Sequence, residues 1–184
     1  MTGAAVIVSG FGGQGLLFAG TVLARAAMAE GLEVLWIPSY GPEMRGGSAA
    51  CTVIVGEEPI GSPIVDHADV VIALSAPALA RYGTFVAPGG LLVVDGTLME
   101  IPSISGVEVV APPCTSLARS AGDDRLVSIV ALGALVARRR IVGIEALRAA
   151  LRDVAGAKHP EVLRADLQAL SAGMVAVDAL AAPV

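Results

Sequence analysis

A strand, a glycine-rich turn and a helix open the chain, and this succession constrains the fold more than any other stretch. Residues 4–10, AAVIVSG, are β-branched and apolar, which predicts a buried strand. The turn GFGGQG leads into residues 16–31, whose small side chains favour a helix packed closely on a sheet and whose Gly31 marks its end. LEVLWI at 32–37 predicts the second strand. Such a β–α–β unit implies a right-handed crossover and a parallel pair of strands.

The rest of the chain continues this alternation and then becomes helical. Apolar runs predict strands at 48–56, 69–74, 90–95 and 106–112, with a turn segment at 57–63 and a short helix at 76–86. Helical patterns follow at 115–121, 125–140, 144–155 and about 160–181. We therefore expect an α/β fold, a single three-layer Rossmann-like domain over 1–184 with a mainly parallel sheet and a helical C-terminal third.

Composition disfavours several classes of function. Hydrophobic residues make up 55% of the 184 residues and charged residues 16%, so much of the chain should be buried and its surface partly covered by partners. A net charge of −5 disfavours binding to nucleic acid, which requires a basic face. The apolar stretch 126–137 is shorter than a bilayer span, and the start of the chain lacks the basic region of a signal peptide. We expect a cytoplasmic protein that binds no membrane.

The chain offers no convincing catalytic or metal-binding set of its own. Cys51 and Cys114 lie far apart and outside any C-x-x-C pair, so an iron–sulfur cluster held by this chain alone is not expected. His67 has no second ligand type nearby that would favour a metal. Asp66 and Asp69 are close to each other, but each can cap the segment that follows it. We therefore predict no catalytic residue and no bound metal.

The glycine-rich turn is the first candidate binding site. Gly10, Gly12 and Gly15 fit the spacing G-x-G-x-x-G between a strand and a helix. In this interpretation Gly10 permits the tight turn, Gly12 lets a ligand approach the backbone, and Gly15 lets helix and strand pack closely. Gly13 and Gln14 complete the turn, where the free N–H groups of the helix start favour an anion and the Gln14 amide can bond a ligand or a neighbouring backbone.

The known nucleotide-binding versions of this turn fit poorly. A dinucleotide site needs an acidic residue at the end of the second strand, whereas Glu33 lies at its start. A P-loop needs a lysine that this turn does not contain. A free-standing nucleotide-binding α/β protein is therefore kept as the alternative function, and an α/β scaffold that only dimerises is a third.

The loop PSYGPEMRGG at 38–47 is the second candidate site. Its prolines and glycines make it costly to order, which suggests a ligand or partner that repays the ordering. It is expected at the same sheet edge as the glycine-rich turn, so the two should build one surface. Arg45 can pair with a phosphate, a partner carboxylate or the loop's own Glu43. The candidate contact residues of the loop are Ser39, Tyr40, Glu43, Arg45, Gly46 and Gly47.

Five segments in this order carry a resemblance to a known family. They are GFGGQGLLFAGTVLARAA, PSYGPEMRGGSAACTVIV, PIGSPIVDHADVVIAL, PGGLLVVDGTL and ALGALV. Together they resemble the gamma subunit of 2-oxoacid:ferredoxin oxidoreductases over nearly the whole chain. Within the family the sequence looks most like the 2-oxoglutarate and branched-chain 2-oxoacid types.

The resemblance implies that the subunits of the assembled enzyme have different roles. The assembled enzyme oxidatively decarboxylates a 2-oxoacid such as pyruvate, ketoisovalerate or 2-oxoglutarate and joins the acyl group to coenzyme A. Alpha, beta and delta partners hold thiamine diphosphate, Mg²⁺ and 4Fe–4S clusters and pass electrons to ferredoxin. The gamma chain binds none of these tightly and supports assembly, with a proposed contribution to the coenzyme A side of the active site. In isolation it can also form a homodimer.

Two positions depart from the family pattern. The family often shows Asn before the A-L-G-A-L helix, where this chain has Ser128, and Asn in the last helix, where it has Asp166. Both departures weaken any role assigned to those two amides.

Overall fold

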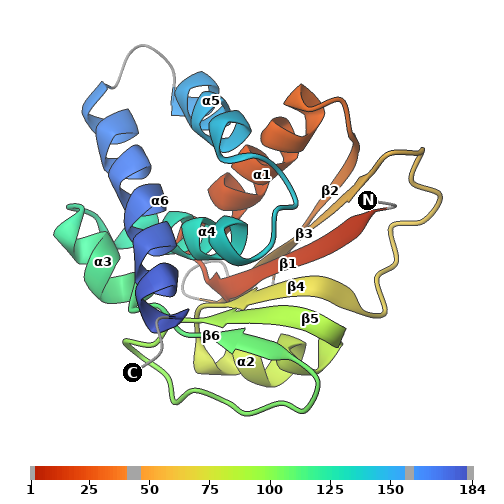
Figure 1. Cartoon of the computed structure of the whole chain (residues 1–184), viewed down its shortest axis with the longest axis horizontal. Coiled ribbons are helices and arrows are strands. Elements are labelled where there is room, and N and C mark those ends of the chain that lie inside the picture. The colour runs from red at the N-terminus through yellow and green to blue at the C-terminus, as the bar shows by residue number, and fades with distance from the viewer. Residues whose placement is uncertain (1–2, 41–46, 156–159, 182–184) are drawn as a thin grey trace.

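One six-stranded mixed sheet forms the centre of the molecule within the residues that the computed structural model describes, 3–40, 47–155 and 160–181 (Figure 1). Its spatial order is β2-β3-β1-β4-β5-β6. The strand bounds are β1 Ala4–Phe11, β2 Glu33–Tyr40, β3 Ser48–Gly56, β4 Ala68–Ala73, β5 Val86–Val94 and β6 Glu108–Val110. Strands β1, β4, β5 and β6 pair in parallel, and β3 pairs antiparallel with both β1 and β2.

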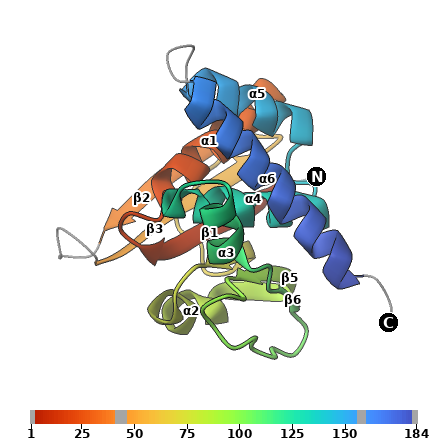
Figure 2. The ribbon, with the colours of Figure 1, turned by 90° about the vertical axis from the view of Figure 1, so that its left-hand side faces the viewer.

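Helices cover the two faces of the sheet unequally. The helix bounds are α1 Leu16–Ala29, α2 Ala76–Tyr82, α3 Cys114–Ser120, α4 Val127–Arg138, α5 Ile144–Ala155 and α6 Pro160–Ala181, with short 3₁₀ turns η1 Gly83–Phe85 and η2 Asp124–Leu126. Helices α1, α4, α5 and α6 lie on one side of the sheet and α2 on the other (Figure 2). The predicted α/β class, the layers and the helical C-terminal third are confirmed.

Side-chain alternation along the strands builds a separate core on each face. On β1, Val6 and Val8 point into the larger core under α1 and α4, whereas Ile7 points into the smaller core under α2. Strand β4 divides in the same way, because Val70 joins the larger core and Val71 the smaller one. Since both faces of the central strands are buried, those strands read in the sequence as continuous apolar runs.

The predicted parallel pairing of the first two strands is wrong. Strand β3 lies between β1 and β2 and runs antiparallel to both, with Phe11 opposite Ser48 and Tyr40 opposite Ala49. The connection from Tyr40 to Ser48 is short enough that β3 turns back along β2 as a hairpin, and β3 then occupies the position beside β1. The ends of β1 and β2 still lie at one edge, because these two strands run in the same direction.

Helices α4 and α6 cross at two glycines. A Cβ built on Gly133 would lie far inside van der Waals contact of the Leu170 carbonyl oxygen, and one on Gly173 would do the same to the Val130 carbonyl oxygen. The two backbones therefore meet directly, without side chains between them. This crossing holds the C-terminal helix on the domain.

Candidate functional site

A backbone hydrogen bond joins the two candidate motifs. The Gly12 N–H donates to the Gly47 carbonyl oxygen over 2.9 Å, which fixes the glycine-rich turn against the end of the 38–47 loop. Gly47 is buried, whereas Gly12 is exposed. The two segments are therefore in direct contact, and the expectation that they form one binding surface stays a prediction. The surface lies where β1 and β2 end and β3 begins.

The Gln14 side chain bonds the surrounding backbone. Its Oε1 accepts the Phe11 N–H over 2.7 Å, and its Nε2 donates to the Leu74 carbonyl oxygen over 3.1 Å. The amide thereby ties the end of β1 to the end of β4. Gly10 is needed beneath it, because a Cβ at residue 10 would occupy the place of the Gln14 Oε1. Of the two roles considered for this amide, the structure shows the bond to a neighbouring backbone.

Replacing Gln14 with alanine is expected to lower the free energy of unfolding by about 1–3 kcal/mol, because two backbone groups lose their partner at once. Chemical denaturation of the isolated chain measures this. Gln168→Ala is the matched control, since Gln168 is exposed on α6 and its replacement should change stability by less than about 0.5 kcal/mol. Equal stabilities of the two variants would contradict a structural role for the Gln14 amide.

Gly13 and Gly15 both have left-handed backbone conformations but face different surroundings. Gly13 has φ +100°, is exposed, and has open space where a Cβ would stand. Gly15 has φ +74° and precedes α1, and a Cβ there would lie 2.5 Å from the Arg125 carbonyl oxygen and 2.9 Å from Ser128 Oγ. The predicted close approach of Gly15 is therefore to the start of α4 and not to a strand. Gly13 is therefore the position in the turn with open space next to its backbone.

The prediction of a loop over all of 38–47 is wrong at its start, because residues 38–40 are the end of strand β2 and pair with β3. Ser39 is exposed near the end of β2 and lies opposite Ala50 of β3. The Tyr40 backbone continues β2 opposite Ala49. The candidate residues Glu43, Arg45 and Gly46 lie outside the described residues.

Sequence analysis missed a polar cluster where β5 ends. The Asp95 carboxylate is fully buried and accepts the Thr97 N–H over 3.0 Å, the Thr115 N–H over 3.2 Å, and the Thr115 hydroxyl. Next to it, the Thr97 and Ser116 hydroxyls lie 3.3 Å apart on the surface. The signal in the sequence was an Asp directly after an apolar strand. The hydrogen bonds show that this Asp anchors the start of α3, because its oxygens are used within the fold.

Neither thiol suits an iron–sulfur cluster. Burial raises the pKa of Cys51 to about 12, and its Sγ lies 3.4 Å from the Leu16 carbonyl oxygen. Burial, with the Asp95 charge, raises the pKa of Cys114 well above its usual range. A cluster binds thiolates, which both sites disfavour. Over 3–40, 47–155 and 160–181, no three His, Cys, Asp or Glu side chains are grouped to hold a metal.

Ser128 of α4 and Asp166 of α6 are buried polar residues. Ser128 Oγ and Asp166 Oδ2 are buried and have no hydrogen-bond partner in the described part of the chain. Burial, and then the charge of Asp123, raises the pKa of Asp166 to about 6. The Asp166 carboxyl is therefore sensitive to pH near neutrality, and the Ser128 hydroxyl lies close to Gly15.

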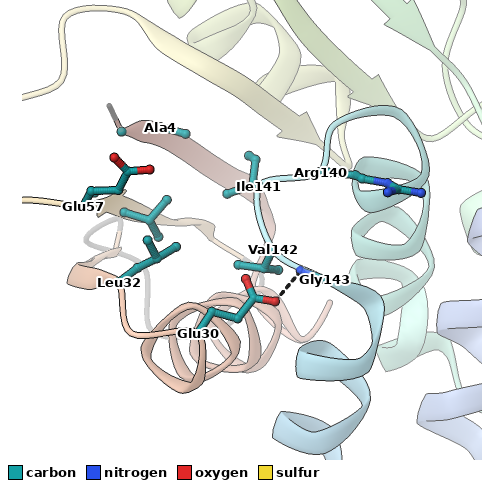
Figure 3. A pocket seen from close by; sticks show the side chains of 11 residues that line it. Ala4, Glu30, Leu32, Glu57, Arg140, Ile141, Val142 and Gly143 are labelled. Carbon is teal, nitrogen blue, oxygen red and sulfur yellow. Dashed lines mark hydrogen bonds between the residues drawn. The ribbon is translucent and has the colours of Figure 1, made fainter. Parts of the chain in front are cut away.

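A hollow of about 330 Å³ lies at the opposite edge of the sheet, away from both motifs (Figure 3). Ala4, Leu32 and Val142 are among the apolar side chains that line it. The Glu30 carboxylate stands at its side and accepts the Gly143 N–H over 2.8 Å, which ties the end of α1 to the segment before α5. No sequence motif pointed to this hollow.

No helix in the described ranges is both long and apolar enough to cross a membrane.

Two longer proteins are similar to this chain, one by sequence and one by structure. The chain is 38% identical over 170 residues to ketoisovalerate oxidoreductase subunit VorA of Methanothermobacter thermautotrophicus, which covers 91% of this chain and 35% of that subunit. A structure of 2-oxoglutarate:ferredoxin oxidoreductase from Magnetococcus marinus, with 2-oxoglutarate, coenzyme A and succinyl-CoA bound, superposes with a TM-score of 0.88 at 28% identity. That match covers 97% of this chain and 32% of the other. The chain thus spans about a third of the length of these two relatives.

A third relative has the same length as this domain. The gamma subunit of a keto/oxoacid ferredoxin oxidoreductase from Geobacter sulfurreducens matches with a TM-score of 0.82 at 29% identity, over 96% of this chain and 99% of that one. The family model described as pyruvate ferredoxin/flavodoxin oxidoreductase matches residues 5–176. The resemblance drawn from the five segments is confirmed. The chain belongs to the pyruvate ferredoxin/flavodoxin oxidoreductase family.

Proposed function

We propose that this chain is the non-catalytic gamma subunit of a thiamine-diphosphate-dependent 2-oxoacid:ferredoxin oxidoreductase. The observation that carries the proposal is the match of nearly the whole fold to one third of a 2-oxoglutarate enzyme and to a separate gamma subunit. The complex would oxidise a 2-oxoacid, release carbon dioxide and transfer the acyl group to coenzyme A. It would act in the cytoplasm.

The chemistry of the described residues favours a non-catalytic role for this chain. The thiols are buried, Asp95 is used within the fold, and the Gln14 amide bonds backbone groups. Such a chain leaves thiamine diphosphate, Mg²⁺ and the 4Fe–4S clusters to alpha, beta and delta partners, and electrons reach ferredoxin through them.

The surface made by the glycine-rich turn and the 38–47 loop is our candidate for the coenzyme A side of the complex. Gly13 leaves its surroundings open, and α1 begins beside it without a side-chain cap. Backbone N–H groups at a helix start favour a phosphate, and a guanidinium can add a bidentate contact. Arg45 of the loop would supply that contact. Gly10, Gly12, Gln14 and Gly15 shape this surface, and Ser39 and Tyr40 border it.

Replacing Arg45 with alanine is expected to raise the KM for coenzyme A of the assembled complex roughly tenfold or more, because a charge-assisted contact is lost. Steady-state kinetics on the reassembled enzyme measures this. Arg152→Ala, at an exposed position of α5, is the matched control and should leave this KM unchanged. An unchanged KM with intact assembly would instead assign Arg45 to a bond within its own loop.

Affinity purification from the native host tests the proposed function as a whole. Tagged protein is expected to bring down thiamine-enzyme subunits, and their absence would refute the proposal. The alternative, a free-standing nucleotide-binding protein, predicts that the isolated chain binds NAD, FAD or a nucleotide in calorimetry. The missing acid at the end of β2 and the internal bonds of Gln14 disfavour it.

A further inference from the structure

Among the described residues, no helix packs on one face of the half-sheet formed by β2 and β3. Helix α2 packs on β1 and β4 and lies beneath the other half of the sheet, away from β2 (Figure 1). On the uncovered face, Leu35 lies opposite Ile54, and Ile37 lies opposite Thr52. Because side chains alternate along a strand, these four point to the side away from α1. We call Leu35, Ile37, Thr52 and Ile54 the open face.

The open face is apolar but does not belong to the protein's own cores. All four side chains are partly exposed. The three aliphatic ones, Leu35, Ile37 and Ile54, are absent from both the larger and the smaller hydrophobic core. On the opposite side of the same strands, Val34 packs against the larger core and Val53 is fully buried in it. Aliphatic side chains gathered on a bare sheet face mark a surface that another polypeptide covers.

The open face leads toward the candidate site. Phe11, at the end of β1, lies on the same side of the sheet by strand alternation and is 39% exposed. It is the residue whose N–H the Gln14 amide binds, so this exposed ring stands at the glycine-rich turn. A partner seated on β2 and β3 would therefore reach the edge where the turn and the 38–47 loop meet.

The lengths of the relatives indicate which partner this is. In VorA and in the Magnetococcus enzyme, the matching domain makes up about a third of one longer chain. The remaining two thirds of that chain are tethered to the domain and must lie near it. On the face toward α1, the chain's own helices cover Val34 and Val53 and leave Trp36 37% exposed, whereas none of the described helices packs on the open face. The open face is therefore the apolar sheet surface available to a neighbour.

We propose that the open face docks the catalytic polypeptide that corresponds to the other two thirds of the chain in the longer relatives. The docked surface of that partner is mainly apolar, and docking places the partner beside the glycine-rich turn. This inference rests on the proposed function, because it names the surface through which the chain joins its complex.

Two charge insertions test the docking surface. Ile37→Lys and Ile54→Lys put an ammonium group on the open face, and each is expected to reduce the recovery of thiamine-enzyme subunits with the tagged chain at least about tenfold. Met28→Lys is the matched control, because Met28 is 64% exposed near the end of α1 and its replacement should leave recovery unchanged. The thermal unfolding of each isolated variant is measured alongside.

The outcomes separate this inference from the proposed function. If the unmodified chain recovers no partner, the proposed function fails. If it recovers partners and both lysine variants do so equally well, the docking surface is wrong and the function stands. If the lysine variants instead abolish a homodimer of the isolated chain and leave the complex intact, the open face binds a second copy.

Hydrogen–deuterium exchange on the unmodified protein covers the case in which a variant fails to fold. Peptides from Glu33–Tyr40 and Ser48–Gly56 are expected to exchange more slowly in the complex than in the isolated chain. Identical exchange in the two states would overturn the proposal.

Discussion

Replacing Gly173 with alanine is expected to lower the free energy of unfolding by about 3 kcal/mol, although alanine is the better helix former by about 1 kcal/mol. The added methyl group would enter the space of the Val130 carbonyl oxygen and approach the Ala134 nitrogen at 3.2 Å. These are backbone atoms of α4, which cannot rotate away as a side chain would. The helices must move apart, and the close contact at Gly133 is lost with them.

Chemical denaturation of the isolated chain measures this effect. Gly61→Ala makes the same chemical change where a Cβ meets open space, and it should alter stability by less than about 1 kcal/mol. A Gly173→Ala protein as stable as the unmodified chain would show that α4 and α6 do not meet backbone to backbone.

Replacing Asp166 with asparagine is expected to stabilise the fold above neutral pH and to have a much smaller effect in acid. Burial and the nearby Asp123 charge raise the pKa of Asp166 from 3.8 to about 6, so the folded chain holds this proton more tightly than the unfolded chain. The contribution of the Asp166 carboxyl to the free energy of unfolding is therefore fully present below pH 3.8 and is lost as the pH rises to about 6. At pH 8 the penalty is on the order of 2–3 kcal/mol.

Denaturation curves of both proteins across pH 4 to 8 measure this difference. Asparagine is neutral throughout, so the stability gained by Asp166→Asn should grow as the pH rises toward about 6 and then stay constant. A gain that does not change with pH would mean that the Asp166 carboxyl does not titrate in this window.

Local patterns predicted most of the elements well. The strand at Ser48–Gly56 and the helices at Ile144–Ala155 and Pro160–Ala181 have the predicted bounds. Strand β5 begins four residues earlier than predicted, at Val86 instead of residue 90, because Val86 already pairs with Ala68 of β4 ahead of a register shift. The predicted helix at 125–140 is divided in the structure into the η2 turn and α4, since Asp123 caps a 3₁₀ turn first.

The candidate site was predicted in part. The two glycine-rich segments were expected together, and the Gly12–Gly47 hydrogen bond brings them together. The partner of Gly15 was misjudged, because the start of α4 lies more than a hundred positions along the chain from the turn and no local pattern connects them. Asp95 was overlooked for the same reason, since its partner Thr115 belongs to a helix that follows a long connection.

The amino-acid sequence by itself determined which segments are strands and helices, where the glycine-rich turn stands, and which family the chain resembles. These features depend on neighbours a few positions apart, whose periodicity and turn propensities act locally. Tertiary structure decided that β3 separates β1 from β2, that Gly133 and Gly173 bring two helices into backbone contact, and that Asp166 is buried without a full set of partners. Each of these depends on contacts between distant segments, which exist only once the sheet has formed and the helices have packed on it.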